Sequence, residues 1–119
     1  QVYFFMVNKM NTKAEVISLF DNPRLAPRAV GRALVVLYNN QTLHERDTKS
    51  TNVHNNTGFS SCDAFIGTKC AEYFIRYNNL KDWMVNYWLK KNAKGTRRIV
   101  KYHRQLILAS KVKELKERT

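Results

Sequence analysis

The chain has 119 residues, of which 44% are hydrophobic and 12% aromatic, so it can bury one modest core but is too short for two. Lysine and arginine number 21 against 9 aspartates and glutamates, and the net charge of +12 attracts polyanions at long range. The apolar content argues against a disordered chain, and no apolar run approaches the roughly 18 residues of a membrane span.

The setting indicated by the sequence is cytoplasmic. The apolar residues 1–6 lack the basic start and the small-residue cleavage site of a signal peptide. Cys62 and Cys70 lie about two turns apart in a segment with a helical pattern, where they cannot easily form a disulfide, so we expect reduced core residues. Because no short-spaced Cys/His pairs occur, we expect neither a metal site nor a cofactor.

The first half of the chain carries signals for three helices. A capping box at residues 12–15 opens a helix that ends near residue 20, before a break at residues 21–27. A second helix is expected from Pro27 to about residue 41, with one apolar face. That face comprises Val30, Leu34, Leu37 and Tyr38. A second capping box at residues 42–45 predicts a short third helix or a bend that reaches about residue 51.

The second half begins with a polar loop at residues 50–61 and continues with three more predicted helices. Ser60 or Ser61 caps the fourth helix, the fifth covers residues 80–92, and the last covers residues 96–117. The apolar positions are Ile66, Cys70, Phe74 and Tyr77 in the fourth helix and Trp83, Met84, Tyr87 and Trp88, expected to be largely buried, in the fifth. We therefore predict an all-α fold, a compact bundle of four to six helices over residues 11–119, after an N-terminal extension at residues 1–10.

Positive charge concentrates in the C-terminal third, where residues 81–119 carry 12 basic and 3 acidic residues, a net of +9. On a helical wheel of the last helix, Arg97, Lys101, Arg104 and Lys111 lie almost opposite Ile99, Tyr102, Leu106 and Ala109. Cations at this spacing can follow a phosphate backbone, so we expect nucleic-acid binding, with an acidic protein surface or simple solvation as alternatives. The predicted nucleic-acid-binding residues are Lys90, Lys91, Lys94, Arg97, Arg98, Lys101, His103, Arg104 and Lys111.

The segment of residues 54–63 is a second candidate site. Asn, Gly and Phe side chains on a loop before a helix N-terminus, with its free N–H groups, could stack on and hydrogen-bond to bases. In the alternative that we favour, Gly58 adopts a left-handed turn, Phe59 packs into the core and Asp63 favours the helix start. The candidate residues of this loop are His54, Asn55, Gly58, Phe59 and Asp63.

Catalytic motifs are missing from the sequence. His44, His54 and His103 have no partner in a known catalytic or metal-binding motif, and the four glycines form no phosphate-binding loop. We therefore expect a protein that is not an enzyme.

Three segments resemble a small domain of bacteriophage and plasmid proteins. Its pattern is an Ala-Leu-x-x-Leu-Tyr-x-x-Gln-Thr helix, a His-Asn-Gly-x-Gly-Phe-x-x-x-Asp loop and a Lys-Tyr-x-x-Gln-Leu helix. Residues 33–42, 54–63 and 101–106 follow it in the same order and with similar spacing, apart from Asn56. Asn56 stands where the pattern has its first loop glycine, which speaks against a tight backbone approach of a ligand there. The resemblance implies a mobile-element protein in a bacterial cytoplasm, and the occurrence of this domain beside helicase modules implies a role at DNA.

These observations predict a non-enzymatic nucleic-acid-binding accessory protein of a phage or other mobile element, with DNA favoured over RNA and no membrane partner. One alternative is a small phage inhibitor that binds a host enzyme or defence complex through its basic face. Another alternative is a structural subunit of a larger particle. Because Lys101 and Arg104 are both assigned to the outer face, we expect Lys101→Glu with Arg104→Glu to weaken nucleic-acid binding without unfolding the domain.

Overall fold

The computed structural model describes residues 10–47 and 57–118, apart from the side chains of residues 42–47, 117 and 118. Over these ranges it contains helices and no strand, which confirms the predicted all-α bundle of four to six helices. The elements are α2 (Lys13–Asp21), α3 (Ala26–Asp47), α4 (Ala64–Tyr77), α5 (Asp82–Leu89), the 3₁₀ helix η1 (Arg98–Tyr102) and α6 (His103–Arg118). Of the expected N-terminal extension, only Met10 is among the described residues.

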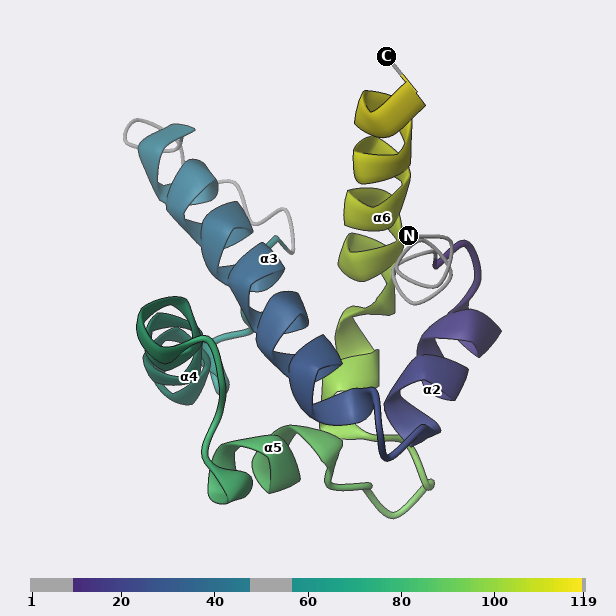
Figure 1. Cartoon of the computed structure of the whole chain (residues 1–119). Coiled ribbons are helices and arrows are strands. Elements are labelled where there is room, and N and C mark those ends of the chain that lie inside the picture. Colours follow the sequence, from purple (N-terminus) through teal and green to yellow (C-terminus); the bar gives the residue numbers. More distant parts are fainter. Residues whose placement is uncertain (1–9, 48–56, 119) are drawn as a thin grey trace.

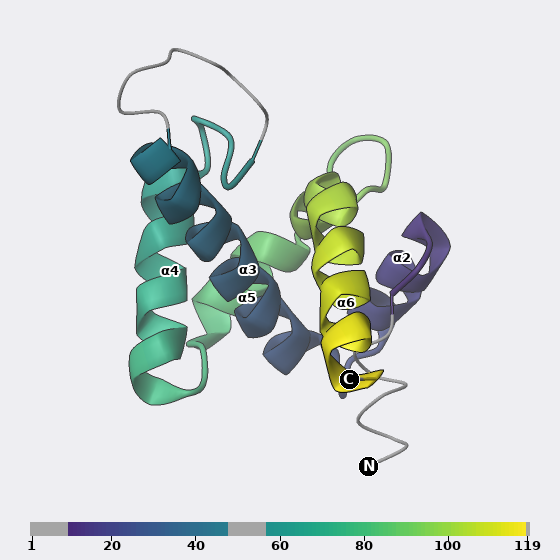
Figure 2. The same ribbon diagram turned by 90° about the horizontal axis from the view of Figure 1, so that it is seen from above.

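Helix α3 forms the centre of the bundle. It contacts α2, α4, α5 and α6, and it lies between α4 and α6 in two perpendicular views (Figures 1 and 2). The predicted apolar face explains this position, because Val30, Leu34 and Leu37 are all fully buried. Gly31 allows α4 to approach closely, since a methyl group in its place would overlap the Phe74 ring.

The capping box before α2 forms as predicted. The Thr12 hydroxyl accepts a hydrogen bond from the Glu15 backbone N–H at 3.2 Å. In return, the Glu15 carboxylate accepts from the Asn11 backbone N–H at 3.1 Å. These bonds satisfy donors that the first helical turn leaves unpaired, and α2 then buries Val16 and Phe20 against the core.

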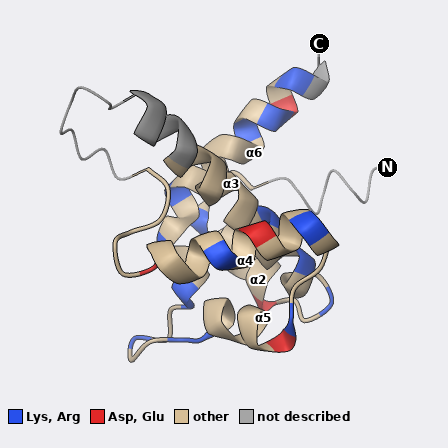
Figure 3. Cartoon of the chain, turned by 90° about the vertical axis from the view of Figure 1, so that its left-hand side faces the viewer, with Lys and Arg blue, Asp and Glu red and all other residues tan. Residues whose placement is uncertain are grey.

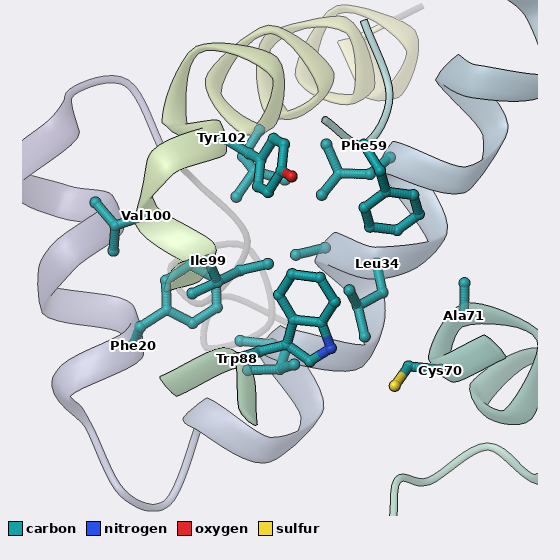
Figure 4. Packing of buried hydrophobic residues seen from close by; sticks show 14 of the residues in the cluster. Phe20, Leu34, Phe59, Cys70, Ala71, Trp88, Ile99, Val100 and Tyr102 are labelled. Atoms are coloured by element: carbon teal, nitrogen blue, oxygen red, sulfur yellow. The ribbon is translucent and has the colours of Figure 1, made fainter. Parts of the chain in front are cut away.

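Trp88 lies at the centre of the core (Figure 4). Its side chain is fully buried, and the Phe59 ring lies 5.9 Å away between centroids. The indole Nε1 is enclosed in the core and points toward Cys70. Burial raises the pKa of the Cys70 thiol, so this cysteine is a neutral core residue as expected.

Four local expectations about the helices are wrong. Helix α3 continues to Asp47 without a third helix, because no glycine or proline interrupts it after residue 41. Cys62 is exposed in the turn before α4, which begins only at Ala64. The N-cap residue of α4 is Asp63, not Ser60 or Ser61, and its side chain makes no capping hydrogen bond.

The fourth wrong expectation concerns the last helix, which begins with the 3₁₀ helix η1 rather than at residue 96.

Two aromatic residues expected in the core are instead at the surface. Tyr77, at the end of α4, is 53% exposed and Trp83, in the first turn of α5, is 48% exposed. Both lie near helix ends, where helical periodicity continues but no neighbouring helix covers the side chain. Tyr77 packs against Tyr73 of its own helix, with 4.6 Å between the ring centroids.

Candidate nucleic-acid interface

A buried carboxylate organises the region where the candidate residues meet. Asp63 has no exposed surface, and the Tyr102 hydroxyl donates a hydrogen bond to its Oδ2 at 2.5 Å. The Lys101 ammonium lies 2.7 Å from Oδ2, and the Arg98 guanidinium lies 3.3 Å from Oδ1. The Ser60 hydroxyl also donates to Oδ2, at 3.4 Å. We call these five residues the Asp63 cluster.

The charges in the Asp63 cluster stabilise each other. Burial by itself would raise the pKa of Asp63, but the hydrogen bonds from Lys101 and Tyr102 and the nearby positive charges outweigh it, so the pKa is lowered. Burial would lower the pKa of Lys101, yet the bond to Asp63 raises it overall. Burial and the bond to Asp63 both raise the pKa of Tyr102. At neutral pH the cluster therefore holds an ionised carboxylate and a protonated amine and phenol.

Side-chain amides hold the loop that leads into the Asp63 cluster. Gln105 accepts a hydrogen bond from the Gly58 N–H at 2.8 Å and donates one to the Gly58 carbonyl at 3.0 Å. Asn40 donates to the same Gln105 oxygen at 2.9 Å. Gly58 has a φ of 75°, and a Cβ at this position would crowd Gln41. Glycine is therefore required here for both conformation and space.

The structure buries three of the five candidate loop residues, Gly58, Phe59 and Asp63. Phe59 is only 8% exposed and packs edge-on against Tyr102, with 6.1 Å between the ring centroids. Gly58 is left-handed and Asp63 lies at the N-cap of α4, as in the interpretation that we favoured, although the Asp63 carboxylate bonds within its cluster and not to the helix N–H groups. This burial is not compatible with base stacking on Phe59. His54 and Asn55 lie outside the described residues.

Residues from the three segments that resemble the phage and plasmid domain converge in this region. One hydrogen-bonded and packed unit contains residues from all three segments. Its members are Gln41 from the first segment, Gly58, Phe59 and Asp63 from the second, and Lys101, Tyr102 and Gln105 from the third. In this structure the residues that carry the resemblance are therefore placed to maintain the fold.

Four of the nine basic candidate residues make contacts within the protein. Arg97 binds Asp21 at 2.8 Å and the Leu89 carbonyl at 2.8 Å. Arg98 and Lys101 belong to the Asp63 cluster, and the His103 ring bonds to the Val100 carbonyl at 3.1 Å. These four residues are therefore already engaged in holding the fold.

The other five candidate residues face solvent. Their charged groups have no hydrogen bond or ion pair with any residue that the structure describes. They are Lys90, Lys91, Lys94, Arg104 and Lys111.

Residues 90–98 form a well-defined loop that we call the basic turn. Lys91 and Arg97 face each other in an antiparallel bridge, and the Asn92 side chain accepts from the backbone N–H groups of Lys94 and Thr96 at 2.9 and 3.0 Å. Gly95 has a φ of 81°, which glycine adopts without strain. The exposed lysines of the turn are thus presented on an ordered backbone.

The outer face of α6 carries apolar as well as basic side chains. Leu108, Val112 and Leu115 are exposed and follow one another at helical spacing beside Arg104 and Lys111. The same wheel places these three residues on the basic side, so the stripe follows from the sequence, although the prediction considered only the basic residues there. The outer face of α6 is therefore apolar as well as basic.

Comparisons with known proteins identify no relative. No family model, curated protein or solved structure matches the chain. No described helix combines the length and apolar character needed to cross a lipid bilayer. Among the described residues, no group of three or more His, Cys, Asp or Glu side chains is placed to hold a metal ion.

Replacing the buried carboxylate is expected to destabilise the fold in a pH-dependent way. Asp63→Asn should lower the free energy of unfolding at pH 7 by about 3 kcal/mol, because Lys101 and Arg98 lose their charged partner. The folded pKa of Asp63 is depressed, so its contribution is present above the unfolded pKa of about 4 and lost as the pH falls through the folded value. Urea unfolding from pH 7 to pH 2 should show the two proteins converging. A constant difference would contradict the assigned charge state.

The two charge reversals that the sequence analysis combined, Lys101→Glu and Arg104→Glu, should differ in their effect on the free energy of unfolding. Lys101→Glu should lower the free energy of unfolding by about 2 kcal/mol, because it removes a charged hydrogen bond and places a second carboxylate near Asp63. Arg104→Glu should change it by no more than about 0.5 kcal/mol, since its side chain is exposed. This corrects the assignment of Lys101 to a free outer face. Equal unfolding midpoints for the two variants would contradict the role given to Lys101.

Proposed function

We propose that this domain binds nucleic acid without catalysing a reaction, through the basic turn and the outer face of α6. The observation that carries the proposal is a stretch without acidic residues, from residue 83 to residue 113, that contains nine lysines and arginines. Figure 3 shows this charge in the turn after α5 and along α6. A surface of this kind attracts the phosphate backbone whatever its base sequence.

The ordered backbone of the basic turn, which carries the exposed lysines, supports the proposal of phosphate binding. The Arg97 contacts with Asp21 and Leu89 fix the base of the basic turn, and the Asn92 hydrogen bonds fix its tip. Because the backbone is already ordered, binding would cost less conformational entropy than ordering a free loop. The internal contacts of Arg97 and Arg98 therefore assist the exposed lysines rather than compete with them.

The resemblance to the phage and plasmid domain gives this function its proposed context. An accessory protein of a phage or other mobile element would meet DNA beside helicase modules, in the cytoplasm of a bacterial host. Nucleic-acid binding through phosphates, without base contacts from Phe59, would suit a partner of variable sequence.

A second candidate function is inhibition of a host protein through the same face. The observation in its favour is the apolar stripe of Leu108, Val112 and Leu115 on α6, because phosphate binding gives no role to exposed leucines. A structural subunit of a larger particle would use the same stripe. Absence of nucleic-acid binding would favour these protein-binding alternatives.

Neutralising the basic turn tests the proposed function. Lys90→Gln with Lys91→Gln and Lys94→Gln should weaken binding to labelled double-stranded DNA roughly tenfold or more in fluorescence anisotropy. The slope of log affinity against log salt should fall in magnitude by roughly 2 to 3, since each phosphate contact contributes about 0.9.

The matched control removes the same charge elsewhere. Lys13→Gln with Lys69→Gln and Lys81→Gln changes three exposed lysines outside the basic turn and α6, and should leave the salt slope nearly unchanged. An equal loss in both triple variants would show that net charge alone drives binding. If the unmodified domain does not bind DNA or RNA near physiological salt, the proposed function is rejected.

A further inference from the structure

Helix α5 carries an exposed aromatic side chain that the fold does not use. Trp83 is 48% exposed, and its indole makes no ring contact or hydrogen bond with any residue that the structure describes. The other tryptophan of the same helix, Trp88, is fully buried. A single exposed tryptophan is not unusual on a protein surface, so the groups around it decide which partner it fits.

A second ring on the same face of α5 is held in place by Arg98. Tyr87 lies one helical turn after Trp83 and is partly buried. The Arg98 guanidinium lies 4.2 Å from the centre of the Tyr87 ring and donates to the Tyr87 carbonyl at 3.3 Å. Because Arg98 also binds the buried Asp63, the position of this ring is fixed from the core. We call the surface formed by Trp83 and Tyr87 the α5 face.

The basic turn follows directly after α5 (Figure 1). Leu89 is the last residue of the helix and Lys90 is the first residue of the turn. The Arg98 backbone N–H donates to the Lys90 carbonyl at 2.9 Å, so both ends of the turn meet at the end of α5. The acidic residue of α5, Asp82, lies in its first turn, at the end away from these lysines. The α5 face and the basic turn are therefore neighbours whose backbones are fixed relative to each other.

We propose that the α5 face stacks on the bases of single-stranded nucleic acid while the lysines of the basic turn bind its phosphates. A single strand offers bases and phosphates together, and proteins bind it with aromatic rings beside a basic surface. A duplex keeps its bases stacked on one another, which would leave the exposed indole without a role. A protein partner would also cover an indole, but the absence of acidic residues from residue 83 to residue 113 favours a polyanion.

This inference rests on the proposed function and adds to it the form of the nucleic acid. Phosphate binding by the basic turn is possible with a single strand and with a duplex. The α5 face would distinguish the two forms, because an aromatic ring can stack only on a base whose face is accessible. Stacking tolerates every base, since each has a π-face, so it agrees with a partner of variable sequence.

The test uses the fluorescence of the two tryptophans in the full chain, of which Trp83 is exposed and Trp88 is buried. Binding of an oligothymidylate of about 15 nucleotides should quench the emission of Trp83. Trp83→Ala should weaken binding of this oligonucleotide roughly tenfold in fluorescence anisotropy, because a base loses its aromatic partner. Affinity for a duplex of the same length should change less than about twofold, and the salt slope should stay the same because no phosphate contact is removed.

Two further variants serve as controls. Trp83→Phe keeps a ring for stacking and should retain most of the affinity, while the emission of the remaining Trp88 should no longer respond to the oligonucleotide. Phe65→Ala removes an exposed aromatic ring from α4, outside the α5 face and the basic turn, and should leave the affinity for the single strand unchanged. Circular dichroism should show that all three variants are folded.

Equal affinity of Trp83→Ala and the unmodified domain for the single strand would overturn the proposal and leave the exposed indole to a protein partner. Unchanged tryptophan emission in the bound state would also overturn it. If neutralising the three lysines of the basic turn still weakens binding in these cases, the proposed function stands and only the stacking role fails. If the domain binds neither the single strand nor the duplex, both proposals fail.

Discussion

A carboxylate that is cut off from water must be compensated from within the fold, and the compensation of Asp63 connects distant parts of this chain. Tyr102, Lys101 and Arg98 reach it from the segment that joins the basic turn to α6, while Ser60 reaches it from the loop before α4. The position of η1 against α4 therefore depends on one ionised side chain. Because Arg98 is the last residue of the basic turn, its contact with Asp63 also fixes the C-terminal end of this turn against the core.

The function proposed for this domain depends on which of its basic side chains bond within the protein and which stay exposed to solvent. Arg97, Arg98 and Lys101 hold the fold, and in doing so they order the chain on either side of them. Lys90, Lys91, Lys94, Arg104 and Lys111 stay exposed. A large positive charge in the sequence does not by itself tell these two groups apart. The positions of two acidic residues, Asp21 and Asp63, decide that Arg97, Arg98 and Lys101 are engaged.

Local signals in the sequence predicted much of the fold. The capping box at Thr12 and the apolar face of α3 depend on residues within a few positions of each other, and both formed as expected. The exposure of Trp83 could not be predicted, because periodicity does not say where a covering helix ends.

The candidate site was harder to predict, because its main bonds are long-range. Tyr102 lies 39 residues from Asp63, and Gln105 lies 47 residues from Gly58.

The most direct test of the role of Asp63 is a double-mutant cycle with Asp63→Asn and Tyr102→Phe, measured by urea unfolding at pH 7. If the buried hydrogen bond couples α4 to η1, the two changes should be non-additive, with a coupling energy of about 1 to 3 kcal/mol. Additivity within about 0.5 kcal/mol would contradict the account, because it would mean that the two side chains stabilise the fold independently.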